Sequence, residues 1–302
     1  MKLIKYFLTC SWACLILAIP WQVAFAQAPE NLSALYESAR GGEGFYQPEK
    51  EEMQRARRLF GAMMQGSWSK HKEEKPNWDS LGFRTLRTSL NGKSYIAVVE
   101  AGDKKGRGLY LVAANPDKRT ALMIPHGMKD LHTAKIGMQM LKQGNFVAAA
   151  FNTVPRYKKK GGEKLEQDMA HSQRNYFLSF TRAFADVFHN GRLVQIHGFA
   201  QKNRDTVAGK RADIILSNGS PVLLQGIFDI AKCLRRDLSY NVAVYPLDVS
   251  ELGGTTNTSG NALQKMGHPG FVHLEMYYQL RKRMLNKDAL LKKVLNCLEL
   301  GQ

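Results

Sequence analysis

Acidic residues are scarce in this chain of 302 residues. Against 43 Lys and Arg there are only 26 Asp and Glu, which gives a formal net charge of +17 and a pI near 9.7. A charge excess of this size bears on solubility and on the kind of partner, and not on the fold. The composition is otherwise ordinary, with 44% hydrophobic and 23% charged residues, and it excludes collagen-like, coiled-coil and wholly disordered chains.

Several well-known sequence signatures are also missing. There is no P-loop, no G-x-G-x-x-G motif and no internal repeat. The basic residues are spread along the chain and not interleaved with aromatic residues, so no specific nucleic-acid binding is expected. A His-Gly pair after a strand can help to form an oxyanion hole, but the chain lacks the G-x-S-x-G elbow that a serine hydrolase of the α/β type needs.

A short apolar run stands at the N-terminus. Lys2 and Lys5 precede an apolar stretch from Tyr6 to Pro20, and Ala24-Phe25-Ala26 follows it. This pattern predicts a signal peptide over residues 1–26, cleaved after Ala26, and a periplasmic or secreted protein with no transmembrane segment after cleavage. The alternative is an uncleaved membrane anchor, for which the apolar stretch is short.

Cysteine is rare as well. Of the four cysteines, Cys10 and Cys14 lie in the predicted signal peptide, so Cys233 and Cys297 remain in the mature chain. In an oxidising compartment these two can form one disulfide. Two buried free thiols are the alternative, because the spacing alone does not show that they lie close together.

The first part of the mature chain is polar and rich in helix-forming residues. Residues 27–82 are predicted as an N-terminal helical arm, since Glu51–Phe60 carries apolar residues at helical spacing. A small antiparallel strand meander follows, with Asn91-Gly92 as a turn signal. Its expected strands are Phe83–Leu90, Ser94–Glu100 and Gly108–Ala114.

Beyond the meander, apolar strand-like runs alternate with helical stretches. This alternation predicts an α/β domain over residues 83–302, with a mainly parallel or mixed twisted sheet and helices on both faces. The expected strands are Ala121–Pro125, Phe146–Phe151, Leu193–Ile196, Ala212–Leu216, Val242–Tyr245 and Phe271–Leu274, and the expected helices include Ala134–Lys142, Ala170–Phe188 and Leu223–Arg235. The run Arg156–Gly162 is interpreted as a basic surface loop.

Polar residues follow three of these apolar strands. His126 and His197 each come directly after a strand, Asp130 lies four residues beyond His126, and Glu275 follows the last strand. Ligands of open α/β sheets bind beyond the carboxyl ends of the strands, so these side chains are expected to converge. Two imidazoles, a carboxylate and an open position form a catalytic zinc site, with one Zn²⁺ per chain held by His126, Asp130 and His197 and with Glu275 as the general base.

Each of these assignments has an alternative. A histidine at a strand end is often a hydrogen-bonded structural residue and not a metal ligand. His132 can take the place of Asp130 as the third ligand, and Glu275 can form an ion pair with Arg281 in the following helix.

At these residues the sequence resembles the zinc carboxypeptidase-like superfamily, and most of all its poly-γ-glutamate hydrolase and N-formylglutamate amidohydrolase branches. The similar pieces are Pro125-His126-Gly127 with Asp130 and Thr133, Ile196-His197-Gly198, and Leu274-Glu275-Met276 leading to Arg281, and together they span about half of the chain. The resemblance implies a phosphorylase/hydrolase-like α/β fold and zinc-dependent amide hydrolysis, with His126, His197 and Asp130 as ligands and Glu275 as the catalytic glutamate. Peptidases of this superfamily carry Glu three residues after the first histidine, whereas this chain has Asp at the fourth.

Other residues are candidates for contact with a substrate. Arg156 is expected to clamp a substrate carboxylate. His171 and Arg174 are expected one turn apart on the helix that Asp168 opens as a possible N-cap, where they face either the crevice or the solvent. Asn257 lies in the Gly/Thr/Asn-rich stretch 253–261, which is either a substrate loop or an ordinary connection.

Two functions follow from these observations. The first is an exported zinc-dependent hydrolase that cuts an amide or peptide bond in an acidic, glutamate-like or cell-wall peptide substrate. The second is a non-catalytic basic exported protein that binds a polyanionic surface.

Overall fold

The computed structural model describes residues 31–41, 45–66, 77–115, 118–160, 163–166 and 168–301. The predicted signal peptide over residues 1–26, with Cys10 and Cys14, lies outside the described residues. Among the helices that are described, none combines the length and apolarity needed to cross a membrane.

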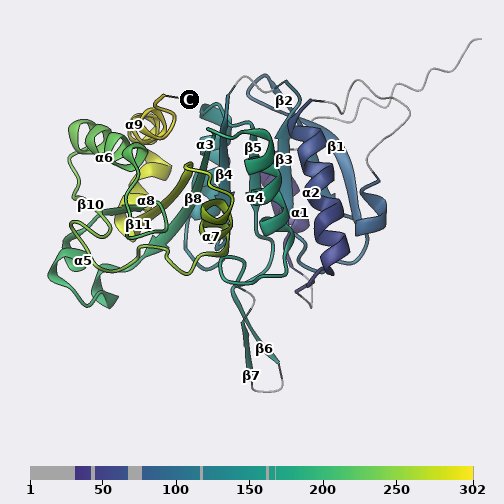
Figure 1. Ribbon diagram of the computed structural model, residues 1–302, viewed down its shortest axis with the longest axis horizontal. Helices are drawn as coiled ribbons and strands as arrows, with labels where there is room; N and C mark the ends of the chain where they lie inside the picture. Colours follow the sequence, from purple (N-terminus) through teal and green to yellow (C-terminus); the bar gives the residue numbers. More distant parts are fainter. Residues whose placement is uncertain are drawn as a thin grey trace, which may run out of the picture.

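A sheet of nine strands forms the centre of the fold (Figure 1). Its spatial order is β1-β2-β3-β5-β4-β8-β11-β9-β10. The strands are β1 (Phe83–Leu90), β2 (Lys93–Glu100), β3 (Leu109–Ala113), β4 (Thr120–Ile124), β5 (Ala148–Phe151), β8 (Arg192–Phe199), β9 (Ile214–Ser217), β10 (Val242–Val244) and β11 (Phe271–Tyr277).

The pairing in this sheet is mixed. The strands β5, β4, β8 and β11 are parallel to their neighbours within that group, and β9 is parallel to β10 but antiparallel to β11. The meander β1-β2-β3 extends the same sheet through the antiparallel pair of β3 and β5. The predicted α/β class with a mixed sheet is thus confirmed, and the meander is one edge of the main sheet.

Helices cover both faces of the sheet. On one face the core contains residues of α1 (Leu32–Ala39), α3 (Thr133–Gln143), α6 (Gln225–Asp237), α8 (Tyr278–Asn286) and α9 (Asp288–Leu298). On the other face it contains residues of α2 (Lys50–Met64), α4 (Tyr176–Val187) and α7 (Thr258–Lys265), which lie in front of the sheet in Figure 1. The short helix α5 (Val207–Arg211) lies between β8 and β9 in the chain. Strands covered on both faces become apolar along their whole length, and every residue of β4, β5 and β9 is buried.

Two local predictions are wrong. The helix expected from Ala170 begins only at Tyr176, because the Asn175 side chain accepts a hydrogen bond from the Leu178 amide and caps the helix there. The basic run expected as a loop contains a strand, β6 (Tyr157–Lys160), which pairs with β7 (Glu163–Glu166) in a separate two-stranded sheet.

Cys233 in α6 and Cys297 in α9 form a disulfide with a sequence separation of 64 residues. The sequence left open a disulfide or two free thiols, and the structure has the disulfide. A loop of this length restricts the unfolded chain and contributes about 4 kcal/mol in the chain-entropy model. The division into a helical arm over 27–82 and a domain over 83–302 stays a prediction.

Candidate metal centre

The candidate residues come from three neighbouring strands in the middle of the sheet. His126 lies in the turn after β4, and His197 and Glu275 lie within β8 and β11, which extend beyond the predicted ends at Ile196 and Leu274. The parallel pair of β8 and β11 places Glu275 directly opposite His197. This register, which continues to Tyr277 opposite Phe199, keeps both strands regular past the two polar residues.

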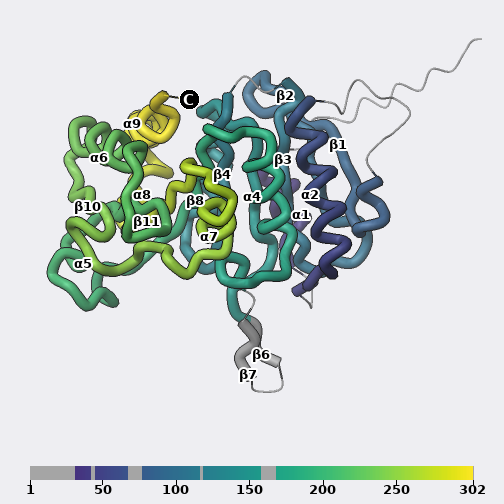
Figure 2. The backbone as a smooth tube through the Cα atoms, viewed as in Figure 1, coloured from purple at the N-terminus to yellow at the C-terminus, as the bar shows by residue number. Residues whose placement is uncertain are grey.

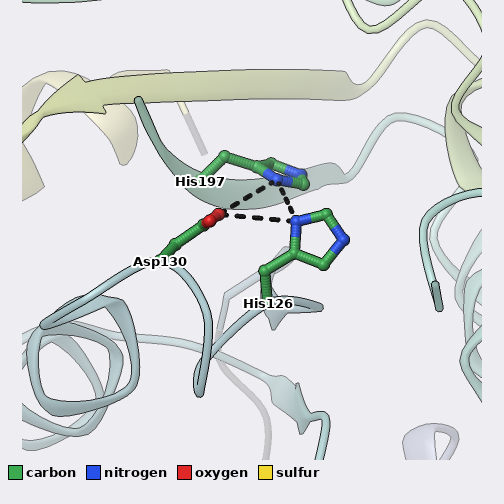
Figure 3. A group of neighbouring side chains, drawn as sticks. All are labelled: His126, Asp130 and His197. Atoms are coloured by element: carbon green, nitrogen blue, oxygen red, sulfur yellow. Dashed lines mark hydrogen bonds and ion pairs between the residues drawn. The ribbon is translucent and has the colours of Figure 1, made fainter. Parts of the chain in front are cut away.

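Three polar side chains point toward one another at this place (Figure 3). The Nδ1 atoms of His126 and His197 lie 3.2 Å apart. The Oδ2 atom of Asp130 lies 3.4 Å from His126 Nδ1 and 3.7 Å from His197 Nδ1. Asp130 is held there because the same oxygen accepts a hydrogen bond of 3.0 Å from the Gly198 amide. The structure therefore brings together one atom from each of the three predicted ligands.

The glycine after each histidine permits a close approach of neighbouring groups. A Cβ atom at Gly198 would overlap the guanidinium of Arg281, and a Cβ atom at Gly127 would lie 2.8 Å from the Tyr36 hydroxyl. Neither glycine has a positive φ. A larger residue at either position would thus displace the groups that surround the histidines.

Asp168 orients the His126 ring through the nitrogen that faces away from Asp130 and His197. His126 Nε2 lies 2.7 Å from Asp168 Oδ1, which also accepts a hydrogen bond of 2.9 Å from the Ala170 amide. The other oxygen, Oδ2, bonds Arg156 at 2.6 Å and His171 Nδ1 at 2.8 Å. An ionised carboxylate only accepts, so His126 carries a proton on Nε2, and Nδ1 is the ring nitrogen that faces Asp130 and His197.

His197 is oriented by a chain of two amides. Asn257 caps α7 through Oδ1, which accepts from the Ser259 and Gly260 amides at 3.0 and 3.2 Å, so its Nδ2 is the donor toward Gln195 Oε1. Gln195 Oε1 in turn lies 2.8 Å from His197 Nε2. This oxygen accepts from both sides, so the network assigns the proton of His197 to Nε2 and leaves Nδ1 as an acceptor.

The pKa values of the group reflect burial and the two carboxylates. Burial alone lowers the pKa of His126, but Asp130 and Asp168 outweigh it and raise the pKa to about 9. Burial holds the pKa of His197 at about 4, although Asp130 opposes it. Burial raises the pKa of Asp130, but the hydrogen bonds to His126 and His197 outweigh it and lower the pKa well below its usual range.

This donor set fits a metal ion. Two imidazole nitrogens and one carboxylate oxygen converge within 3.7 Å of one another. A cation that displaces the proton from His126 Nδ1 would be bound by all three atoms at once. Three protein ligands with an open fourth position are typical of catalytic sites for ions such as zinc. His273 and Glu275 form a second possible group with His197. A third group contains Cys233 and Cys297, which are oxidised to a disulfide and offer no thiolate.

Glu275 lies in the cavity beside this group. The cavity has a volume of about 670 Å³, and His126, Asp130, His197 and Glu275 all line it. Glu275 is 7% exposed, and its Oε2 has no hydrogen-bond partner among the described residues. Burial, followed by the charge of Asp130, raises the pKa of Glu275 to about 8.

Among its described residues, the structure has neither the ion pair of Glu275 with Arg281 nor His132 beside the two histidines. Arg281 donates to the carbonyl oxygens of Leu131 and Phe199, and within the described part of the chain no ion pair joins it to Glu275. His132 lies outside the three-residue group, with its ring 5.5 Å from that of Tyr278. It begins α3 with a φ of +77°, and this turn directs Asp130 and not His132 to the two histidines.

Three of the four predicted substrate residues line the cavity, and the fourth, Arg174, does not. Arg156, His171 and Asn257 line the cavity, although each already has a partner. His171 bonds Asp168 and Thr256, and Arg156 bonds Asp168. Arg174 does not line it, since its guanidinium bonds Glu49 and the Pro48 carbonyl oxygen. The expectation that Arg174 and His171 share a helix is wrong, because both precede α4.

Three residues of the site were not recognised in the sequence as parts of it. Asp168 was interpreted only as a possible helix cap, and Gln195 and His273 were not singled out. Gln195 and His273 each lie two residues before a predicted site residue, His197 and Glu275, and residues at this spacing on a strand share one face of the sheet. That periodicity is the signal that points to them.

Replacing Gln195 with methionine is expected to weaken metal binding about 10- to 100-fold, the usual effect of losing a partner behind a ligand. The variant removes the acceptor that fixes the His197 tautomer. Competition with a chelator measures the dissociation constant. Gln139→Met, at a half-buried glutamine of α3 outside the cavity, is the matched control. Equal affinity in the wild type and in Gln195→Met would show that the amide chain does not orient His197.

The raised pKa of Glu275 predicts a pH-dependent stability of the metal-free protein. The folded protein keeps a proton on Glu275 up to about pH 8, whereas the ordinary pKa is 4.5. The stabilising contribution is therefore complete below pH 4.5 and is lost as the pH rises toward 8. Glu275→Gln stays neutral, so denaturant unfolding of the metal-free variant should give a free energy higher than the wild type's by a few kcal/mol above pH 8. The difference should vanish near pH 4.5, and a difference that is constant with pH contradicts the assignment.

Comparisons with known proteins give only distant likenesses. No family model and no curated protein sequence matches the chain. Among solved structures, a "putative metallopeptidase" from Shewanella amazonensis SB2B is 11% identical, with coverage of 85% of this chain and 99% of its own and a TM-score of 0.33. One of the same description from Shewanella baltica OS155 is 8% identical, with coverage of 86% and 97% and a TM-score of 0.32. A gene product from Agrobacterium tumefaciens is 12% identical, with coverage of 61% and 93% and a TM-score of 0.35.

Proposed function

We propose that this protein is an exported zinc-dependent hydrolase that cuts an amide or peptide bond in an acidic, glutamate-like or cell-wall peptide substrate. The observation that supports the proposal is the convergence of His126 Nδ1, His197 Nδ1 and Asp130 Oδ2 within 3.7 Å of one another, beside a buried carboxyl group in an open cavity. This arrangement and the resemblance of the sequence to the zinc carboxypeptidase-like superfamily support metal-dependent amide hydrolysis. Export is proposed from residues 1–26 alone.

The residues divide the chemistry among them. When bound, zinc would polarise the scissile carbonyl and make a water molecule more acidic. Glu275 takes the proton from the attacking water and passes it to the leaving nitrogen, because its carboxyl group lies in the cavity beside the three ligand atoms and its Oε2 has no partner among the described residues. A bound cation would favour the ionised form that accepts this proton. Asp168 and Gln195 hold the two imidazoles in their orientation.

Basic side chains around the cavity support an acidic substrate. Arg204 pairs with Glu251, Arg281 with two backbone carbonyl oxygens, and Arg156 with Asp168. Lys129 also lines the cavity, and its amino group has no side-chain partner among the described residues. We propose that a substrate carboxylate binds near Lys129 and Arg156.

The test is hydrolysis by the purified mature protein with and without metal. A chelator should abolish cleavage of glutamyl amides or cell-wall peptides, and stoichiometric zinc should restore it. A protein that takes up no metal, or one whose cleavage is unchanged by chelation, contradicts the proposal.

A further inference from the structure

A second hollow, of about 400 Å³, lies where α2 meets α4 and the segment before it. The two helices come from distant parts of the chain and run side by side (Figure 2). Four cationic residues line this hollow, namely Lys50, Arg57, Arg174 and Arg182, against a single acidic one, Glu49. We refer to it as the α2–α4 pocket.

Two of the four cations are already neutralised. Arg57 bonds both oxygens of Asp186 at 2.6 Å, and Arg174 bonds Glu49 at 2.5 Å. Within the described residues, Arg182 and Lys50 have no acidic partner. Burial and the nearby charge of Arg57 lower the pKa of Arg182. A half-buried guanidinium without an acidic partner is electrostatically unfavourable, and a bound anion would neutralise it.

The pocket also has groups that suit an organic anion. Met53 lines it and packs with Leu178 and Ala262 in a small apolar cluster. Gln54 and Gln173 add amides that can donate hydrogen bonds. Cationic side chains, amides and an apolar contact together are typical of a site for a carboxylate- or phosphate-bearing ligand.

A short segment joins this pocket to the metal centre. Asp168 bonds His126, and His171 lines the first cavity, whereas Gln173 and Arg174 line the α2–α4 pocket. The residues between them are held by hydrogen bonds from Asn175 to the carbonyl oxygens of Met169 and Ser172. An anion in the pocket therefore lies against the same turn that positions Asp168.

We propose that the α2–α4 pocket is an anion-binding site for a ligand with at least two carboxylate or phosphate charges. Two sources have this chemistry, a free small anion and a distal acidic part of a polymeric substrate. The second source rests on the proposed hydrolase function, whereas the site itself does not, because none of its lining residues belongs to the metal centre.

The test is isothermal titration of the metal-free protein at low salt with pyrophosphate, citrate and a glutamate hexamer. The double variant Lys50→Gln with Arg182→Gln is compared with Lys232→Gln and Arg236→Gln, two exposed cations of α6 whose replacement changes the net charge equally. We expect saturable binding of one anion per chain, at least tenfold weaker in the pocket variant and unchanged in the α6 variant.

The outcomes separate the sources and the proposals. Binding of pyrophosphate or citrate indicates a small-anion site, and binding of the hexamer alone indicates a substrate site. Equal weakening in both double variants shows unspecific charge attraction, and absence of saturable binding or an unaffected pocket variant also overturns the proposal. His126→Ala with His197→Ala is expected to keep the anion site, so failure of the hydrolase function remains distinguishable.

Discussion

Replacing Glu275 with glutamine is expected to lower kcat for amide hydrolysis about 10²- to 10⁴-fold, the range for losing a general acid-base group. The substitution keeps the size and shape of the side chain but removes the ability to take a proton from water. Because Glu275 is outside the three converging ligands, zinc content should stay at one per chain. KM should change little, since substrate binding falls to other residues of the cavity.

Kinetics on metal-loaded protein, with zinc content measured on the same samples, check this result. Glu37→Gln, at an exposed position of α1, is the control and should behave as the wild type. If Glu275→Gln retains a tenth or more of the wild-type kcat, Glu275 is not the general base. If it loses its metal, Glu275 is a ligand, as the second possible group with His197 and His273 would require.

The double replacement of His126 and His197 with alanine is expected to reduce bound zinc from about one per chain to none. It removes two of the three converging ligand atoms, and a single carboxylate on the surface of a cavity binds zinc weakly. Elemental analysis after dialysis against a zinc buffer measures the content. His189→Ala, an exposed histidine after α4, is the matched control.

Two further variants make the result decisive. His126 contacts two carboxylates, so alanine at this position leaves them without a partner, and circular dichroism must show that the variant is folded. The pair His126→Gln with His197→Gln keeps polar groups in place and should also lose the metal. His273→Gln should keep it, and loss of zinc in His273→Gln but not in His126→Gln would place the ion on the other side of His197.

The sequence was sufficient to predict most of the elements around the site. Apolar runs of four to eight residues separated by turn residues indicated the α/β class, and the parallel strands β4, β8 and β11 stand where these runs occur. The helix before Tyr176 was overpredicted. The His171 and Ser172 amides both donate to the Asp168 carbonyl oxygen, and the Asn175 side chain donates to the Ser172 carbonyl oxygen, so this segment forms a turn that ends where Asn175 caps α4.

His126, Asp130, His197 and Glu275 were candidates because of their places after apolar strands. The sequence could not show whether Asp130 or His132 points toward His126 and His197, because both residues lie in the short segment between β4 and α3. The αL backbone of His132 and the hydrogen bond from Gly198 to Asp130 decide this, and both depend on how β4 lies beside β8.

The class of the fold and the alternation of its elements could be predicted from the chain alone, because they follow from hydrophobic periodicity and local backbone preference. The residue types at the ends of the strands could be read there as well. The partners of those residues, in contrast, depend on how the strands and helices pack together. The register places Glu275 opposite His197 on the neighbouring strand. Asp168 supports His126 from 42 positions away, and Asn257 reaches Gln195, the partner of His197, from 62 positions away. Such contacts arise from the packing of strands and helices over one core, which no local pattern in the chain encodes.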